Sequence, residues 1–189
     1  MQAVDQGPTG LDYITLIIAV FGAVLGAAAF VWQIASFKMS GPRIVVRLAA
    51  GWIGPSGALV FEVQDTWEPI DRPNENFIEE CFAVQVHNAG RMPASITGWW
   101  LQIGPASLGQ HVSPWNKPCP HRLEAYAEET WFVDRDQVLS VAQALTRGVK
   151  RGKPIYKPGQ PVEIRAAVSI GGQESKQSKN STKVPGRAS

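Results

Sequence analysis

The stretch FIEECFAVQVH at positions 77–87 is the clearest β-strand of this sequence. Its apolar side chains alternate, with Phe82, Val84 and Val86 at every second position. Because successive side chains of a strand point to opposite faces, this spacing predicts a strand with one face in a core. Turn residues at 88–93 follow, and the stretch ASITGWWLQI at 94–103 predicts a second strand that runs back.

Short segments rich in β-branched or aromatic residues recur on both sides of this pair, separated by glycine and proline turns. They predict strands at 43–50, 58–64, 130–133 and 162–170, with 173–178 pairing back and long loops at 65–76 and 104–120. Helical spacing after Asp134, a capping residue, predicts one helix at 135–146. About seven or eight short strands and one inserted helix predict a mainly β fold, an antiparallel immunoglobulin-like β-sandwich.

A second landmark is the uncharged stretch YITLIIAVFGAVLGAAAFVWQIASF at Tyr13–Phe37. It exceeds the roughly 18 apolar residues that mark a membrane span and is too long for the core of a cleavable signal peptide. Tyr13 and Trp32 are spaced like the aromatic residues at the two interfaces of a bilayer. We therefore expect an uncleaved transmembrane helix, the alternative being a buried helix of a soluble assembly. Gly22 and Gly26 form a G-x-x-x-G motif that predicts a homodimer, although glycine is common in transmembrane helices anyway.

Basic residues flank only the C-terminal side of this stretch, at Lys38, Arg43 and Arg47. The positive-inside rule then predicts an outside N-terminus and a cytoplasmic C-terminal domain at the plasma (inner) membrane. The expected organisation is a short tail at 1–12, a transmembrane helix at 13–37, a β-sandwich domain at 38–179 and a disordered tail at 180–189.

The composition and the cysteines restrict the class of protein. A formal net charge of +2 is too small for a dedicated nucleic-acid-binding protein. Two distant cysteines, Cys81 and Cys119, favour free thiols in a reducing compartment, whereas a disulfide between them would indicate export.

Motifs that carry chemistry are missing from the sequence. The candidate metal ligands Cys81, Cys119, His87, His111 and His121 do not form a known zinc pattern, and Cys119-x-His121 supplies only two ligands. His121 is better explained as a structural hydrogen-bonding residue. No G-x-S-x-G, P-loop or G-x-G-x-x-G occurs, so we expect a non-enzymatic protein without a cofactor or metal.

Tryptophan is the more informative residue type. Five of the seven tryptophans, at 52, 67, 99, 100 and 115, are too many for one small core. Since aromatic side chains on a surface mark protein contacts, we expect a partner-binding surface formed by Trp67, the Trp99–Trp100 pair and Trp115. Arg91 at an exposed turn is a further candidate. The alternative is that loops bury most of these rings. The basic connector at 147–157 is either a solvated loop or a contact with anionic lipid.

The segment VQVHNAG at 84–90, followed by Pro93–Ile96, resembles the V-x-V-x-N-x-G hairpin of bacterial immunoglobulin-like domains of the CARDB (adhesion-related) type. In those domains the asparagine ends a core strand and the glycine takes the turn. The layout also resembles bacterial and phage proteins with one N-terminal membrane helix, an S-G-P-R segment and a P-H-R-L-E segment, here Ser40–Arg43 and Pro120–Glu124. This chain departs from the pattern at Ala125–Ala127, where the resemblance implies a P-G turn.

These features together predict a single-pass, membrane-anchored protein-interaction module that binds the lipid bilayer and a protein partner. Two alternatives use the same anchor. One is an exported envelope or adhesion-type domain, and the other is a phage-encoded membrane factor that alters the host envelope.

Overall fold

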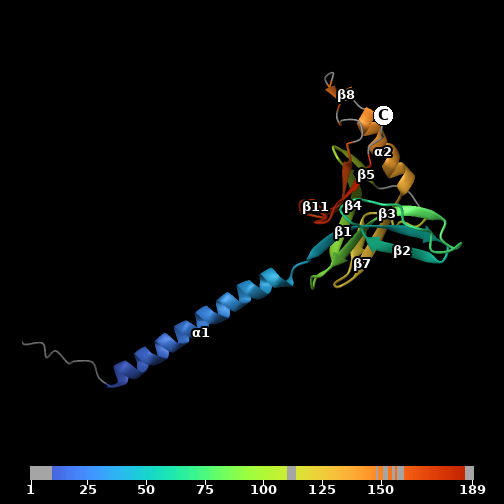
Figure 1. Ribbon diagram of the computed structural model, residues 1–189. Coiled ribbons are helices and arrows are strands. Elements are labelled where there is room, and N and C mark those ends of the chain that lie inside the picture. The colour runs from blue at the N-terminus through green and yellow to red at the C-terminus, as the bar shows by residue number, and fades with distance from the viewer. Residues whose placement is uncertain are drawn as a thin grey trace, which may run out of the picture. The chain divides into compact units, whose positions relative to one another are not determined.

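The computed structural model describes residues 10–109, 114–147, 149–150, 153–154, 156 and 160–185. The chain divides into two compact units, Met1–Gly41 and Pro42–Ser189 (Figure 1). The first unit contains helix α1 (Gly10–Ser40), and the second contains the β-strands and a second helix.

Helix α1 contains one segment, Tyr13–Phe37, that is long and apolar enough to cross a membrane. Its apolar side chains are exposed, for example 69 % of Trp32 and 81 % of Phe37. A core helix of a soluble protein would bury such residues. A signal sequence near an N-terminus can pass the same test of length and apolar composition, so the helix is a candidate membrane span.

The second unit is built from two antiparallel sheets. The first sheet has the strand order β2-β1-β3-β7. Its strands are β1 (Ile44–Gly54), β2 (Gly57–Glu62), β3 (Glu79–Asn88) and β7 (Glu128–Asp134). The second sheet has the order β11-β10-β4-β5, with β12 also paired to β10 and β6 to β4. Its strands are β4 (Ala94–Ile103), β5 (Ala106–Gly109), β6 (His121–Leu123), β10 (Val162–Ile170), β11 (Lys176–Gln177) and β12 (Thr182–Val184).

The inner faces of the two sheets share one hydrophobic core, so the prediction of a mainly β fold with two antiparallel sheets is confirmed. Phe82, Val84 and Val86 of β3 are fully buried, as their alternation predicts. Leu101 of β4 and Ile164 of β10 complete the core from the other sheet. Which subclass of sandwich this is, immunoglobulin-like or another, stays a prediction.

One predicted pairing is wrong, because β3 and β4 do not form a hairpin. They belong to different sheets, since β3 pairs with β1 and β7 on its two edges while β4 pairs with β10, β5 and β6. The turn at 88–93 therefore crosses from one sheet to the other. The sequence does not distinguish a hairpin from such a crossing. In both cases the strands alternate in the same way and turn residues lie between them.

Asn88 holds this corner together at the end of β3. Its side chain is fully buried. The Oδ1 atom accepts hydrogen bonds from the N–H groups of Arg43 at 3.2 Å and Gly90 at 3.0 Å. The Nδ2 atom donates to the carbonyl of Met92 at 2.8 Å and to that of Glu124 at 3.1 Å. Asn88 thus connects the start of β1, the crossing turn and the turn that follows β6.

Helix α2 (Arg135–Arg147) confirms the one predicted helix of the domain. The carboxylate of Asp134 accepts hydrogen bonds from the backbone N–H groups of Asp136 and Gln137, which is the predicted N-cap. Val138 and Ala142 are fully buried, and α2 packs against strands of both sheets. A short strand pair follows, β8 (Val149–Lys150) with β9 (Lys153–Pro154), so part of the predicted basic connector lies in it and part lies outside the described residues.

The expected disordered tail at 180–189 is wrong for residues 180–185. Strand β12 pairs with β10, and Thr182 and Val184 are fully buried. Residues 186–189 lie outside the described part of the chain. The predicted long loop at 104–120 likewise contains a strand, β5, which pairs with β4.

Candidate functional site

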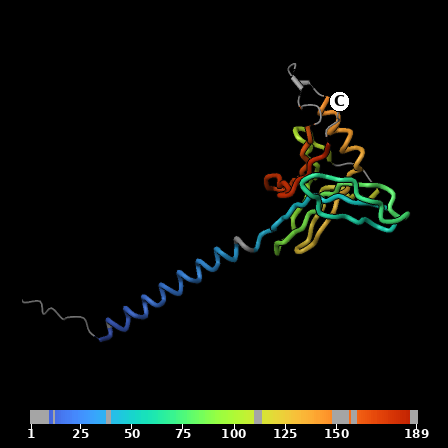
Figure 2. Tube along the Cα trace, in the orientation of Figure 1, coloured from blue at the N-terminus to red at the C-terminus, as the bar shows by residue number. Residues whose placement is uncertain are grey.

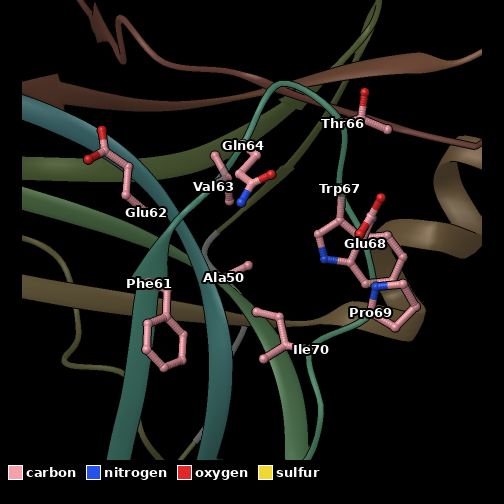
Figure 3. Close-up of a pocket in the computed structure, with 10 residues that line it drawn as sticks. All are labelled: Ala50, Phe61, Glu62, Val63, Gln64, Thr66, Trp67, Glu68, Pro69 and Ile70. Carbon is pink, nitrogen blue, oxygen red and sulfur yellow. The ribbon is translucent and has the colours of Figure 1, made fainter.

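A hollow of about 430 Å³ opens beside β2 and is the candidate binding site (Figure 3). We call it the Trp67 pocket. Its lining combines apolar side chains with two carboxylates at the rim. The lining residues are Ala50, Phe61, Glu62, Val63, Gln64, Thr66, Trp67, Glu68, Pro69 and Ile70.

The inner face of β2 supplies the floor of the Trp67 pocket. Phe61 lies opposite Ala50 in the register of β1 and β2, and Leu59 lies opposite Trp52. Directly opposed residues share a face of the sheet, and Ala50 belongs to the core, so Phe61 also points to the core side. Nevertheless Phe61 is 48 % exposed. The core of the sandwich is therefore left open at this edge.

The chain that leaves β2 bridges the two sheets and forms the opposite wall. The N–H of Trp67 donates to the carbonyl of Lys183 in β12 at 3.1 Å, and the N–H of Lys183 donates to the carbonyl of Asp65 at 2.9 Å. The segment then returns to the first sheet, where the indole N–H of Trp52 donates to the carbonyl of Ile70 at 2.9 Å. These bonds hold Trp67 and Ile70 on one side of the hollow (Figure 3).

The indole of Trp67 packs against a partly buried ion pair and a core ring. Its ring lies 5.9 Å from the ring of Phe82, centroid to centroid. The guanidinium of Arg135 lies 5.5 Å from the Trp67 ring centroid and donates to Oε2 of Glu80 at 2.6 Å. The hydrogen bond to Glu80 raises the pKa of Arg135, so its guanidinium stays charged and can attract the indole face. This wall of the pocket is thus rigid.

Negative charge is concentrated in the part of the chain that lines the Trp67 pocket. Between positions 62 and 80 the chain carries seven carboxylates and only one basic residue, Arg72. Two of these carboxylates, Glu62 and Glu68, line the pocket itself and are exposed. The site therefore offers an apolar hollow inside a negatively charged rim.

The structure does not bring the predicted partner-binding residues together. Trp67 is only 9 % exposed and Trp99 only 2 %, with Trp99 stacked on Trp131 at 6.3 Å between ring centroids. Both rings lie in the core between the sheets, in agreement with the alternative that most of these rings are buried, so a partner-binding surface that exposes both of them is wrong. Trp100 points to the other face of β4 and is half-buried, as the alternation along a strand predicts.

The other two predicted partner-binding residues lie away from the Trp67 pocket lining. Trp115 is 38 % exposed and precedes β6, and Arg91 is exposed in the crossing turn. Their role in partner binding stays a prediction. Sequence reasoning selected Trp67 but missed Phe61 and the acidic rim, although the density of acidic residues from 62 to 80 was a visible signal.

Both cysteines are free thiols in the structure. Burial, followed by the negative charges of Glu80, Glu79 and Asp134, raises the pKa of Cys81 to about 12. Burial also raises the pKa of Cys119. A nucleophilic cysteine needs the opposite shift, so neither thiol has the environment of a reactive cysteine.

Within the described residues, no group of three His, Cys, Asp or Glu side chains could hold a metal ion. His111 lies outside the described residues. The Nε2 atom of His121 lies 3.2 Å from Oε2 of Glu129, and its ring packs edge-on against Trp131 at 6.0 Å. These contacts are those of a structural residue.

No protein-family model matches the chain, and no curated protein matches it. The resemblance to bacterial immunoglobulin-like domains of the CARDB type therefore stays a prediction.

Proposed function

We propose that this chain is a single-pass, membrane-anchored, non-enzymatic interaction module that captures an apolar side chain of a protein partner in the Trp67 pocket. The Trp67 pocket is the observation that carries the proposal. Apolar hollows with a polar rim are typical of protein-binding sites, in which one buried anchor contributes most of the binding energy.

The construction of the Trp67 pocket supports this function. Its walls are tied to both sheets by hydrogen bonds, so little conformational entropy is lost when a partner binds. Its volume of about 430 Å³ is enough for a large side chain. Phe61 lies partly in solvent and gains burial on binding, at about 25 cal/mol for each Å² of apolar surface.

The proposal places α1 in the plasma (inner) membrane with the β domain in the cytoplasm. Lys38, Arg43 and Arg47 support this orientation through the positive-inside rule. The free thiols of Cys81 and Cys119 are compatible with a reducing compartment. An exported domain on the same anchor would have the opposite orientation.

Reporter fusions to the C-terminus test the orientation. We expect a fluorescent protein fused there to be fluorescent and alkaline phosphatase fused there to be inactive. Active phosphatase without fluorescence would overturn the cytoplasmic location and favour the exported envelope module. A fusion protein that fractionates as soluble would remove the anchor from the proposal.

Photo-crosslinking tests the pocket. A benzoylphenylalanine replaces Phe61 in the full chain, and a matched variant carries it in place of Tyr126, an aromatic residue that is 63 % exposed and lies outside the pocket lining. We expect one discrete crosslinked product from membranes of the Phe61 variant and none from the Tyr126 variant. Equal crosslinking at both positions, or none at Phe61, would contradict partner binding in the pocket.

A further inference from the structure

Strand β1 is paired on only one side over its first five residues. Strand β3 pairs with β1 from Ile44 to Ile53, whereas β2 pairs only from Ala49 to Gly54. The edge from Ile44 to Leu48 that faces away from β3 therefore has no strand beside it in the sheet. Such an edge presents a row of backbone donors and acceptors.

The hydrogen bonds of Leu48 show which groups face this open edge. Asn180 binds both the N–H and the carbonyl of Leu48 on this side, with N–O distances of 2.9 and 2.8 Å. Alternate residues of an antiparallel strand direct their backbone groups to the same edge. The N–H and C=O groups of Val46 and Ile44 therefore also face it. Within the described residues, no hydrogen bond reaches them there.

A basic groove of about 500 Å³ runs along this edge. One wall is β1 with Arg43 and Arg47, and the other contains Lys176 and Lys179. Strand β11, which contains Lys176, contacts β1, and the chain between β10 and β12 lies beside the start of β1 (Figure 2). All four basic side chains are exposed, and Glu62 is the only acidic residue among those that line the groove.

We propose that this groove binds an extended acidic segment of a partner protein, which adds to β1 as a further strand of the first sheet. Backbone hydrogen bonds to Ile44 and Val46 would position the segment, as in other cases of strand addition. The site is separate from the Trp67 pocket, although Glu62 lies at the end of β2 on the wall of both.

The charges explain why the occupant is acidic on both of its faces. Val46 and Leu48 point to the core, so Arg47 and Arg43 point to the outer face of the sheet, where they meet one set of side chains of the added strand. The other set faces the wall with Lys176 and Lys179. Basic residues along an edge disfavour pairing with most strands, and the same charges favour an acidic one.

Hydrogen exchange and peptide binding test the proposal on the full chain in phosphatidylcholine nanodiscs. The probe, called the Glu-Val peptide, is a fluorescent peptide of two Glu-Glu-Val-Val repeats, which place glutamate on both faces of an extended strand. The controls are a Lys-Val peptide and a Glu-Val peptide with methylated backbone nitrogens. Arg47→Glu and Lys179→Glu reverse charges in the groove, and Arg122→Glu reverses a charge that is 71 % exposed and not among the groove residues.

We expect the Glu-Val peptide to bind and each groove variant to weaken binding about tenfold or more, while Arg122→Glu leaves it unchanged. The Val46 amide should exchange quickly in the free protein and slow down with peptide. The Val45 and Arg47 amides, which face β3, should be protected in both states. Equal binding of the methylated peptide, or an unprotected Val46 amide in the complex, would overturn strand addition. No binding of any peptide, together with binding of the embedded chain to phosphatidylglycerol vesicles that Arg47→Glu and Lys179→Glu weaken, would instead assign the groove to lipid headgroups.

Discussion

The side chain of Asn180 occupies the position that a strand would take beside Leu48. Its Oδ1 accepts a hydrogen bond from the Leu48 N–H at 2.9 Å, and its Nδ2 donates to the Leu48 carbonyl at 2.8 Å, across 132 residues of sequence. This amide ends the open edge of β1 and ties the C-terminal segment to the first sheet. Leu48 itself is fully buried.

Asn180→Ala should therefore destabilise the β domain. The substitution leaves the N–H and carbonyl of Leu48 without their partner, and we expect the free energy of unfolding to fall by about 1–3 kcal/mol. Urea unfolding followed by tryptophan fluorescence measures it. The matched control is Asn74→Ala, which removes one hydrogen bond in an exposed turn and should change little. Equal losses of unfolding free energy in the two variants would show that Asn180 contributes no more to stability than an exposed hydrogen bond does.

Asn88→Ala should have a larger effect than Asn180→Ala. The Asn88 side chain is fully buried, and it connects three segments through both its oxygen and its nitrogen. Its loss leaves several buried backbone groups unpaired, so we expect a cost of roughly 3 kcal/mol or more. Asn88→Asp keeps the acceptor for the N–H groups of Arg43 and Gly90 but loses the donor to Met92. Its free energy of unfolding should therefore remain well below that of the wild type. An unchanged free energy of unfolding in Asn88→Ala would show that Asn88 does not stabilise this corner of the fold.

The two asparagines show how far the sequence predicts the fold. Strand β3, strand β10 and helix α2 were predictable because their apolar residues repeat with the period of the element. The segment around Asn180 contains polar residues that become ordered only through distant partners, Leu48 and β10. No local sequence pattern predicts contacts with such distant partners. From the sequence alone, an ordered polar segment therefore looks the same as a disordered tail.

The candidate site was predictable in part for the same reason. The alternation of β2 indicates that Phe61 lies on an apolar face, but its exposure depends on where the second sheet ends. Trp67 looked exposed because it lies in a proline-containing polar stretch. Its burial comes from the backbone bond to Lys183, which lies more than a hundred residues further along the chain.

Tyr126 is the one described residue other than glycine with a positive φ, at 61°. It stands in the turn where the resemblance implies a P-G pair. A residue with a side chain that adopts this left-handed backbone conformation is destabilised by about 1–2 kcal/mol, whereas glycine adopts it without this cost. Since the Tyr126 side chain is 63 % exposed, we expect Tyr126→Gly to raise the melting temperature and Tyr126→Val to lower it. A lower melting temperature for Tyr126→Gly would show that the ring makes a stabilising contact.

The ion pair of Glu80 and Arg135 should be strongly coupled. The Glu80 side chain is only 7 % exposed, and Arg135 lies 2.6 Å from it. Arg135→Met leaves the Glu80 carboxylate uncompensated in a poorly solvated site, whereas Arg135 is 33 % exposed and tolerates Glu80→Gln better. The double variant should therefore be more stable than the sum of the single variants predicts, by about 1–3 kcal/mol. The exposed pair of Glu163 and Arg165 is the matched control, and its coupling should be below about 1 kcal/mol. Similar coupling in the two pairs would contradict a rigid wall behind Trp67.

Cys81 should resist alkylation in the folded protein, whereas Cys119, which is only partly buried, should react slowly. The thiolate is the reactive form, and burial holds the pKa of Cys81 at about 12, so this thiol stays protonated at pH 8. Mass spectrometry after iodoacetamide treatment should find Cys119 modified and Cys81 unmodified, with both modified in urea. Rapid native alkylation of Cys81 would show that β3 opens readily.

The same shift predicts a pH dependence of stability. The folded pKa of Cys81 lies above its ordinary value of 9.0, so the folded state holds this proton more tightly than the unfolded state. The contribution of Cys81 to the free energy of unfolding is fully present below about pH 9 and is lost as the pH rises toward 12. This free energy falls by at most about 1.4 kcal/mol per pH unit. Cys81→Ala removes it, so the wild type should lose stability faster than the variant between pH 9 and 11. Parallel curves would contradict the raised pKa.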